Sequence, residues 1–348
     1  MATRIVGLDI GDGSIRAAEV TAATSSRPAL TKLRHMPLPH GAVRGGEVIE
    51  HNTVVTALKQ LWADGKFRSR RVVLGMGNQK VMVRELTVQR APLEQVKQGL
   101  PFHVQEMLPV PVDDALLDFY PATEAQGEHG PVVNGLLIAA VKEAVVANVK
   151  AVEAAGLTPA GVDLIPFALY RALVPNPVAG QIVAVIDVGS TTTNVVIARG
   201  HVPLFVRIVP MGGDDVTKAL VRRLELDAED ADTLKRRLGL ALEGVAPEDV
   251  HAVEVIREAT NELLRSISNT LAYFSHQQKG AAIDRMFLVG GGAQLSGFSE
   301  ALMELTRAEV RDGDVFVDLK VPDTVRESVP AERSHSFATA LGLVRGAR

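Results

Sequence analysis

One short pattern occurs twice in this sequence, about half a chain apart. The first copy, RIVGLDIGDGSIRAAEV, starts at residue 4, and the second, AVIDVGSTTTNVVIARG, starts at residue 184. Each copy is an apolar run, an Asp, a Gly-led polar turn and a second apolar run. This order predicts a β-hairpin with the Asp at the end of its first strand. A hairpin of this form in each half of the chain predicts two similar domains.

Strands and helices are expected to alternate along the rest of the chain. Runs such as RRVVLGMG at 70–77 are typical of buried strands, and KEAVVANVKAVEAAGL at 142–157 has the spacing of a helix. The alternation predicts an α/β fold. The stretch PNPVAG at 175–180 is the best linker candidate, because the hairpin pattern begins again after it. With 348 residues, the chain can form two domains of about 150 residues each.

Composition excludes several classes of site and partner. The chain has no cysteine, so it has no disulfide, no Cys metal site and no thiol nucleophile. A net charge of −4, without a basic patch rich in aromatic residues, argues against a nucleic-acid partner. We expect no signal peptide in MATRIVGLDIG and no amphipathic membrane anchor in ATALGLVRGAR. The sequence contains no uncharged apolar run of about 18 residues, so it predicts no transmembrane helix.

The two Asp residues of the repeated pattern, Asp9 and Asp187, occupy matching positions. A carboxylate at the end of a buried strand is costly unless a partner satisfies it. Hydrated Mg²⁺ is one such partner, because it prefers carboxylate and water oxygens. The adjoining turns offer backbone N–H groups and hydroxyls, which suit phosphate oxygens. One copy alone is more often a plain tight turn, but two copies predict a clamp for a polyphosphate and its metal ion.

A third Gly-rich segment, LVGGGAQLSG, occupies 288–297. By itself it is a weak signal, since it connects a predicted strand to a predicted helix. Its three glycines also allow a flat or charged group to approach the backbone closely. Together with the two hairpins, it favours a ligand site over three unrelated turns.

The ordered set of these segments, with VPMGGDDVTKAL between them and SFATALGLVRG at the end, resembles the actin-like ATPase superfamily. That superfamily includes heat-shock chaperone ATPases, the division protein FtsA and sugar kinases. The resemblance covers nearly the whole chain. It implies two ribonuclease-H-like domains around an interdomain nucleotide cleft that takes ATP or ADP with Mg²⁺.

The middle of the chain is similar to the PilM family of type IV pilus assembly proteins, through VMVRELTV, LLDFYPATE, GLLIAAVKEAVVANVKAVEAAGLTPAGVDL and PFALYRAL. This similarity implies an FtsA-type inserted subdomain. Its pattern predicts a strand, a helix interrupted near Pro101 and two more strands, at 115–124 and 132–141, around a polar loop. The expected division is a first domain of 1–79, 142–177 and 334–348, an insert of 80–141 and a second domain of 178–333.

The resemblance also implies a role for each matching residue. Three segments would contact the phosphates, ribose and adenosine, and the Asp pair would order the waters of Mg²⁺. The implied phosphate contacts are Gly11, Asp12, Gly13, Ser14 and Arg16 from the first loop, and Gly189, Ser190, Thr191 and Thr192 from the second. Gly212, Gly213 and Asp214 would lie near the ribose and phosphates, Gly290, Gly291 and Gly292 under the adenosine, and Asp232 and Lys235 beside the adenine and ribose. For the last two, a solvated helix face with an i,i+3 charge pair is an equal alternative.

Two positions depart from the family pattern. Arg16 stands where the first loop usually ends in a Lys, which keeps the charge but changes a point donor into a fork. Ile165 stands where we expect an acidic residue that would position the attacking water. An isoleucine can neither accept a proton nor orient water. We therefore predict nucleotide binding with slow or absent hydrolysis, and we assign no catalytic residue.

The resemblance implies a partner as well, the N-terminal cytoplasmic tail of a PilN-type inner-membrane protein. This tail would lie in a groove between the insert and the first domain, and it would recruit a cytoplasmic protein to the inner face of the membrane. The segment LPFHVQEMLP could contribute, although such a stripe is more often core. Other platform proteins and the pilus motor are further candidate partners. The alternatives are a small-molecule kinase of the same superfamily, an FtsA-like division protein and a degenerate binder with a purely structural nucleotide.

Overall fold

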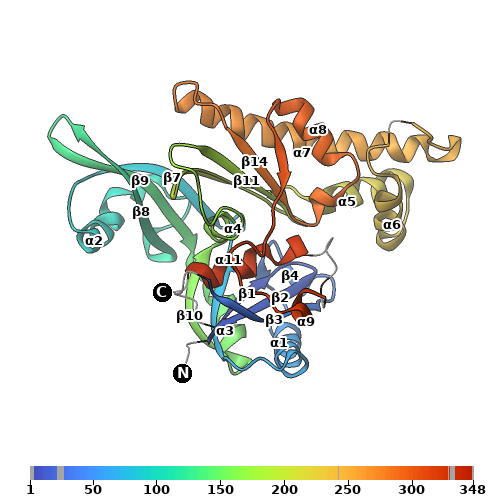
Figure 1. Cartoon of the computed structure of the whole chain (residues 1–348), viewed down its shortest axis with the longest axis horizontal. Coiled ribbons are helices and arrows are strands. Elements are labelled where there is room, and N and C mark those ends of the chain that lie inside the picture. Colours follow the sequence, from blue (N-terminus) through green and yellow to red (C-terminus); the bar gives the residue numbers. More distant parts are fainter. Residues whose placement is uncertain (1–3, 22–26, 242, 328, 330–333, 347–348) are drawn as a thin grey trace.

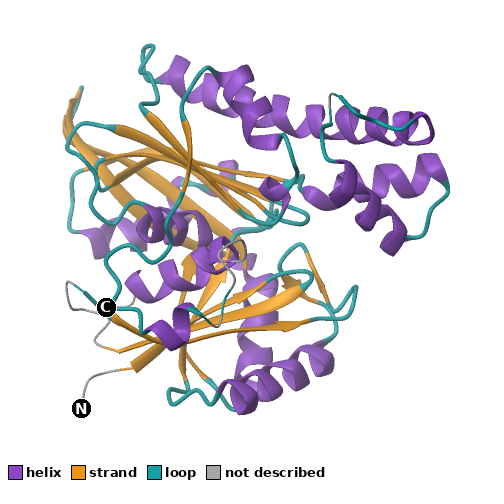
Figure 2. Cartoon of the chain, turned by 45° about the vertical axis from the view of Figure 1, so that its right-hand side comes forward, coloured by secondary structure: helices purple, strands orange, loops and turns teal. Residues whose placement is uncertain are grey.

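A computed structural model describes residues 4–21, 27–241, 243–327, 329 and 334–346. Two five-stranded sheets lie in separate halves of the molecule (Figures 1 and 2), with strand orders β10-β6-β1-β2-β3 and β13-β12-β11-β14-β15. In both sheets the hairpin strands are followed by a third antiparallel strand, and two parallel strands lie on the other side. The predicted α/β class and the predicted similarity of the halves are therefore confirmed.

The first sheet and its helices come mostly from the N-terminal half of the chain. Its strands are β1 (Arg4–Ile10), β2 (Ser14–Thr21), β3 (Ala29–Pro37), β6 (Arg71–Met76) and β10 (Thr158–Leu164). Helices α1 (His51–Gly65) and α3 (Lys142–Ala154) cover it, and β4 (Val43–Arg44) pairs with β5 (Glu47–Val48) beside it. The α1 face is amphipathic, because Val54, Leu58 and Leu61 are buried at helical spacing.

The second sheet begins directly after the predicted linker. Its strands are β11 (Ile182–Val188), β12 (Thr193–Arg199), β13 (Val202–Val209), β14 (Arg285–Val289) and β15 (Val310–Asp312). Its helices are α5 (Gly213–Leu224), α6 (Ala228–Leu238), α7 (Val250–Gln277) and α8 (Phe298–Thr306). The long helix α7 buries Leu263, Ile267 and Phe274 against this sheet.

Residues 81–141 carry a third sheet of their own, with the strand order β7-β9-β8. It consists of β7 (Val81–Gln89), β8 (Ala115–Gly127) and β9 (Gly130–Val141), with α2 (Leu93–His103) packed on β8 and β9. The helix continues through Pro101 to His103, so an interruption at Pro101 was a wrong prediction. Proline at this position removes the hydrogen bond that an N–H would donate to the carbonyl of Lys97, and the helix tolerates this loss near its C-terminal end. The two strands also extend further than predicted, to a turn of two residues.

Two short helices connect the halves, α4 (Ile165–Leu173) and α11 (Ala338–Gly346), which lie between the two sheets in Figure 1. They pack backbone to backbone, because a Cβ added at Gly342 would lie 1.8 Å from the carbonyl oxygen of Ala168. The other side of α11 packs equally closely on β1, where a Cβ at Gly7 would lie 1.9 Å from the oxygen of Ala340. Glycine is therefore required at both contacts.

The chain passes between its halves at two points that lie side by side. The first follows α4 at the predicted linker, and the second precedes α9 (Asp323–Arg326) at Gly313. A Cβ added at Gly313 would lie 2.3 Å from Cδ2 of Leu173, the last residue of α4. The hydroxyl of Tyr170 on α4 also donates to the carbonyl of Gly200 in the second half, and burial raises the pKa of Tyr170 to about 12.

A buried carboxylate on β2 holds the segment that leads into β6. Glu19 is 1% exposed, and its Oε1 accepts hydrogen bonds of 2.8 Å from the backbone N–H groups of Arg68 and Ser69. The hydroxyl of Thr31 donates to its other oxygen. These bonds satisfy a buried charge and fix the start of β6, whose far end reaches the cavity described below. None of the described helices is long and apolar enough to cross a membrane.

Candidate functional site

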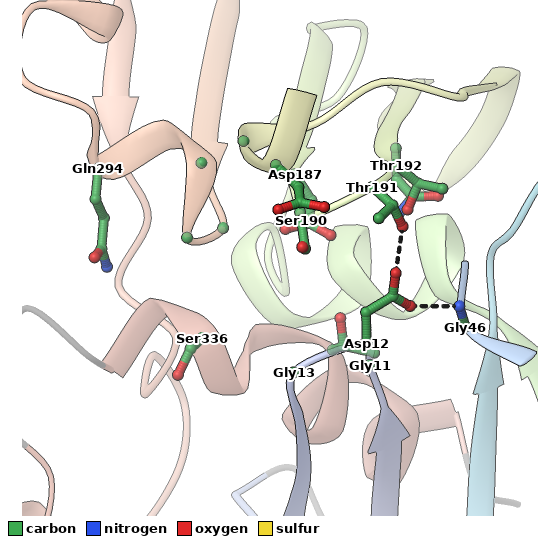
Figure 3. A pocket seen from close by; sticks show the side chains of 18 of the residues that line it. Gly11, Asp12, Gly13, Gly46, Asp187, Ser190, Thr191, Thr192, Gln294 and Ser336 are labelled. Atoms are coloured by element: carbon green, nitrogen blue, oxygen red, sulfur yellow. Dashed lines mark hydrogen bonds between the residues drawn. The ribbon is translucent and has the colours of Figure 1, made fainter. Parts of the chain in front are cut away.

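The turns of the two hairpins face a common cavity of about 550 Å³. Figure 3 shows residues of both turns around it, with the start of α11 below. The structure brings together all but two of the residues predicted for the site. Those that line the cavity are Asp9, Gly11, Asp12, Gly13, Arg16, Asp187, Gly189, Ser190, Thr191, Thr192, Gly213, Asp214, Asp232, Lys235, Gly290, Gly291 and Gly292.

Ser14 and Gly212 are the two predicted residues outside the lining. The backbone oxygen of Ser14 accepts from the N–H of Gly11 at 3.1 Å and closes the first turn. A Cβ at Gly212 would lie 2.4 Å from the carbonyl oxygen of Ser190, so this glycine lets α5 begin directly against the second turn. Both residues shape the turns, and their predicted contact with a ligand stays a prediction.

The second turn is held by the first amides of α5. The N–H of Gly213 donates to the carbonyl of Gly189 at 2.9 Å, and the N–H of Asp214 donates to that of Ser190 at 2.8 Å. These donors are therefore engaged within the protein. Ser190, Thr191 and Thr192 of this turn line the cavity, and each carries a side-chain hydroxyl.

The third Gly-rich segment packs against the end of β11. Gly290 has a φ of +97°, and a Cβ there would lie 2.3 Å from the carbonyl oxygen of Val188 and 2.5 Å from Oδ1 of Asp187. Both the conformation and the lack of space require glycine. The segment therefore brings its backbone to the carboxylate that the second hairpin presents.

Asp9 and Asp187 lie close enough to influence each other. Burial raises the pKa of Asp9, and the guanidinium of Arg16, 3.4 Å away, opposes that rise. Burial, and then the negative charge of Asp9, raise the pKa of Asp187 to about 6, against a hydrogen bond from Asn194 and the charge of Arg16. The two carboxylates thus share one arginine. A further cation between Asp9 and Asp187 would relieve the repulsion between them.

The residues present fit a hydrated metal ion better than a directly bound one. Among the described residues, no three His, Cys, Asp or Glu side chains gather as a metal site. Mg²⁺ commonly keeps several waters and contacts one or two carboxylates. Asp9 and Asp187 together have only the single positive charge of Arg16 beside them. The pair therefore suits Mg²⁺ held through water.

Two buried side chains of the lining have polar atoms without a hydrogen-bond partner, Oδ1 of Asn194 and Oγ1 of Thr260. Thr260 lies on α7, beside an apolar part of the lining formed by Leu263, Leu295 and Phe298. An unmet polar atom in a buried site is costly, and a ligand can satisfy it. The cavity therefore has a polar end at the two hairpin turns and an apolar end with a hydroxyl.

Sequence reasoning missed both of these residues, for different reasons. Asn194 is the cross-strand partner of Asp187, as Arg16 is of Asp9, so hairpin register could have found it. Thr260 lies inside a long amphipathic helix and has no local signal. His335, Ser336 and Thr339, which line the cavity from the C-terminal segment, likewise have no local sequence signal.

Asp232 and Lys235 form more than a solvated charge pair. Lys235 is 14% exposed, and its Nζ lies 2.7 Å from both Oδ1 of Asp232 and the hydroxyl of Thr217 on α5. Burial would raise the pKa of Asp232, but hydrogen bonds from Lys235 and Arg236 outweigh it and lower that pKa. The pair therefore fixes α6 against α5 at the edge of the cavity.

Ile165 begins α4 and forms an apolar part of the wall. A Cβ at Gly77 would lie 2.7 Å from Cβ of Ile165 and 3.1 Å from Oδ1 of Asn194, and Gly75 is similarly close to Ile165. The isoleucine thus fills the space left by two glycines at the end of β6. This part of the wall offers a ligand no group that accepts a proton.

Asp12 connects the two hairpins across the cavity. Its carboxylate accepts a hydrogen bond of 2.8 Å from the N–H of Gly46 in the β4–β5 turn and one of 2.7 Å from the hydroxyl of Thr191 in the second hairpin turn. Figure 3 shows both bonds. The first and second turns are therefore joined by one side chain.

Comparisons with known proteins agree with this geometry. A family model described as type IV pilus assembly protein PilM matches residues 7–346. The solved structure of a PilM–PilN type IV pilus biogenesis complex is 28% identical, covers 100% of both chains and has a TM-score of 0.86. The ethanolamine utilization protein EutJ of Carboxydothermus hydrogenoformans is 16% identical, covers 99% of this chain and 90% of its own, and has a TM-score of 0.58. MreB5 of Spiroplasma citri is 10% identical, covers 97% and 94%, and has a TM-score of 0.57.

Curated relatives include the cell division protein FtsA of Bacillus subtilis, 28% identical over 195 residues, which are 51% of this chain and 44% of that protein. FtsA of Streptococcus pneumoniae is also 28% identical, over 52% of this chain and 41% of its own length. The chain spans less than half the length of these relatives. EutJ and MreB5 show the same fold, and the family match covers nearly the whole sequence. The chain therefore has the actin-like ATPase fold and belongs to the PilM family of type IV pilus assembly proteins.

Proposed function

We propose that this chain binds ATP or ADP with Mg²⁺ in the cavity between its hairpins, and binds the N-terminal cytoplasmic tail of a PilN-type membrane protein. It would act as a cytoplasmic component of the type IV pilus platform, brought to the inner face of the membrane by that partner. The observation that carries the nucleotide part is the Asp pair, whose two carboxylates have one arginine between them and lie beside a turn that carries the hydroxyls of Ser190 and Thr192. In support, the MreB5 structure with this fold is one bound to ADP.

Within the proposed site, each group has a distinct task. Asp9 and Asp187 hold the metal waters, and Arg16 opposes the rise that burial causes in the pKa of Asp9. The bound Mg²⁺ would neutralise phosphate charge. The hydroxyls of Ser190 and Thr192 donate to phosphate oxygens, and the apolar end around Thr260 takes the base.

We expect ATP turnover below about 1 s⁻¹, because Ile165 supplies no group that orients the attacking water. The measurement is steady-state phosphate release from the purified protein with Mg-ATP. An Asp187→Asn variant prepared in the same way reveals any contaminating ATPase, whose activity would persist in it. A rate of 1 s⁻¹ or more that the variant loses would contradict the prediction.

The partner part of the proposal is supported by the related structure, which is a complex of PilM with PilN. The segment LPFHVQEMLP, suggested by the sequence, has both buried and exposed apolar side chains. Leu100 and Val104 are buried with Phe119, whereas Phe102 is 86% exposed. Most of the stripe is therefore core of the insert, and the residues that contact the tail stay unassigned.

The decisive test is calorimetric titration of a PilN-type N-terminal peptide into the protein, with and without Mg-ATP. We expect saturable binding of the peptide and, in a separate titration, of the nucleotide. A peptide of the same composition in scrambled order is the control. If neither the peptide nor the nucleotide binds, the proposed function fails. If the scrambled peptide binds equally well, the partner assignment fails alone.

A further inference from the structure

The first hairpin turn carries a negative charge at the place where phosphate is expected. Asp12 lies between Gly11 and Gly13 and lines the cavity. Both of its hydrogen-bond donors, the N–H of Gly46 and the hydroxyl of Thr191, are neutral. Among the described residues, no Lys, Arg or His forms an ion pair with it. Its charge therefore faces the cavity without a cationic partner.

Thr191 cannot serve Asp12 and a phosphate at the same time. A hydroxyl has one hydrogen to donate, and here it points at the carboxylate, 2.7 Å away. A phosphoryl group that accepts the hydrogen of this hydroxyl must break that bond. It must also approach a carboxylate of the same sign, which disfavours binding.

The metal ion is poorly placed to remove this conflict. The Asp9–Asp187 pair would hold Mg²⁺ through water, and Asp12 belongs to no described cluster of three acidic groups. The side chain of Asp12 is instead committed to two turns by two short hydrogen bonds. Its charge thus acts on the phosphate chain rather than as a further metal ligand.

We propose that Asp12 makes this site prefer a nucleoside diphosphate over a triphosphate. This inference rests on the proposed nucleotide site and concerns its specificity. With the diphosphate bound, the hydrogen bond between Asp12 and Thr191 persists and keeps the two hairpins together. The terminal phosphate of a triphosphate lies against the carboxylate of Asp12 and forces the two hairpins apart.

Calorimetric titrations with Mg-ADP and Mg-ATP test the proposal. We expect the unaltered protein to bind ADP about tenfold more tightly than ATP. In Asp12→Asn, which keeps an acceptor for Gly46 but loses the charge, ATP affinity should rise about tenfold and ADP affinity should change less than threefold. Asp64→Asn, an exposed substitution on α1, is the matched control and should keep the ADP preference.

Thr191→Val separates the charge of Asp12 from its hydrogen bond across the cavity. The preference for ADP should persist in this variant, because the carboxylate remains. The proposal is overturned if the unaltered protein binds ATP as tightly as ADP, or if Asp12→Asn leaves the ratio unchanged. If neither nucleotide binds the unaltered protein, the proposed site itself fails. Should Asp12→Asn not fold, the ratio in the unaltered protein and in Thr191→Val decides.

Discussion

Replacing Asp187 by asparagine is expected to stabilise the metal-free protein at pH 7, by about 3 kcal/mol at most. The pKa of this carboxyl lies near 6 in the folded protein, above its ordinary value of 3.8. Between these values the folded state holds the proton more tightly than the unfolded state, so stability falls as pH rises from about 4 to 6. At pH 7 the whole cost is present. Asparagine never ionises, yet its Oδ1 can still accept the hydrogen bond from Asn194.

Urea unfolding in the presence of a chelator measures this difference. The advantage of Asp187→Asn should shrink to about half at pH 5 and disappear below about pH 3, where the native carboxyl is protonated in both states. Asp64→Asn should show neither the gain nor its pH dependence. In Asp187→Asn we also expect the Mg²⁺-dependent part of nucleotide affinity to be lost. A loss of stability at pH 7 would show that burial and Asp9 do not burden this carboxylate.

Replacing Gly342 by alanine is expected to lower the free energy of unfolding by about 3 kcal/mol or more. The added methyl would lie 1.8 Å from the backbone oxygen of Ala168, so no side-chain rotation can relieve the clash. Helices α4 and α11 would have to move apart, and α11 is also fixed to β1 at Gly7. The loss should therefore exceed that of an ordinary core substitution.

Gly161→Ala in β10 is the matched control. A Cβ at this position meets nothing within 4 Å, and the residue is exposed. Chemical denaturation of both variants against the parent gives the comparison. If Gly342→Ala unfolds at the same denaturant concentration as Gly161→Ala, the close contact of the two helices is not a constraint on stability.

The features that local patterns control were predictable from the sequence. Both hairpins, the third Gly-rich segment and the helix that follows it are short units with their own turn chemistry. Their common pattern, written twice, predicted that Asp9 and Asp187 would meet at one cavity, and both line it. The apolar wall at Ile165 was likewise visible as a departure from the family.

Contacts between distant segments were not predictable in this way. Asp12 and Thr191 are 179 residues apart, and nothing near either residue indicates their hydrogen bond. The burial of Glu19 depends on backbone donors from a loop about 50 residues later. The helix through Pro101 was missed for a different reason, since the burial of Leu100 and Val104 in the core of the insert outweighs the local effect of the proline. In each case the deciding partner lies outside the local sequence.

The two crossings of the chain between its halves lie together at Leu173 and Gly313, beside the packed pair α4 and α11. We expect such an arrangement to act as a hinge, because segments on its axis would hardly move if the halves rotated. Displacement then grows with distance from the axis. Helices α1 and α6, far apart in Figure 1 on opposite halves, form the long arms of this lever. A pair of optical labels on these two helices would magnify a rotation of a few degrees, whereas labels beside α4 would report almost none of it.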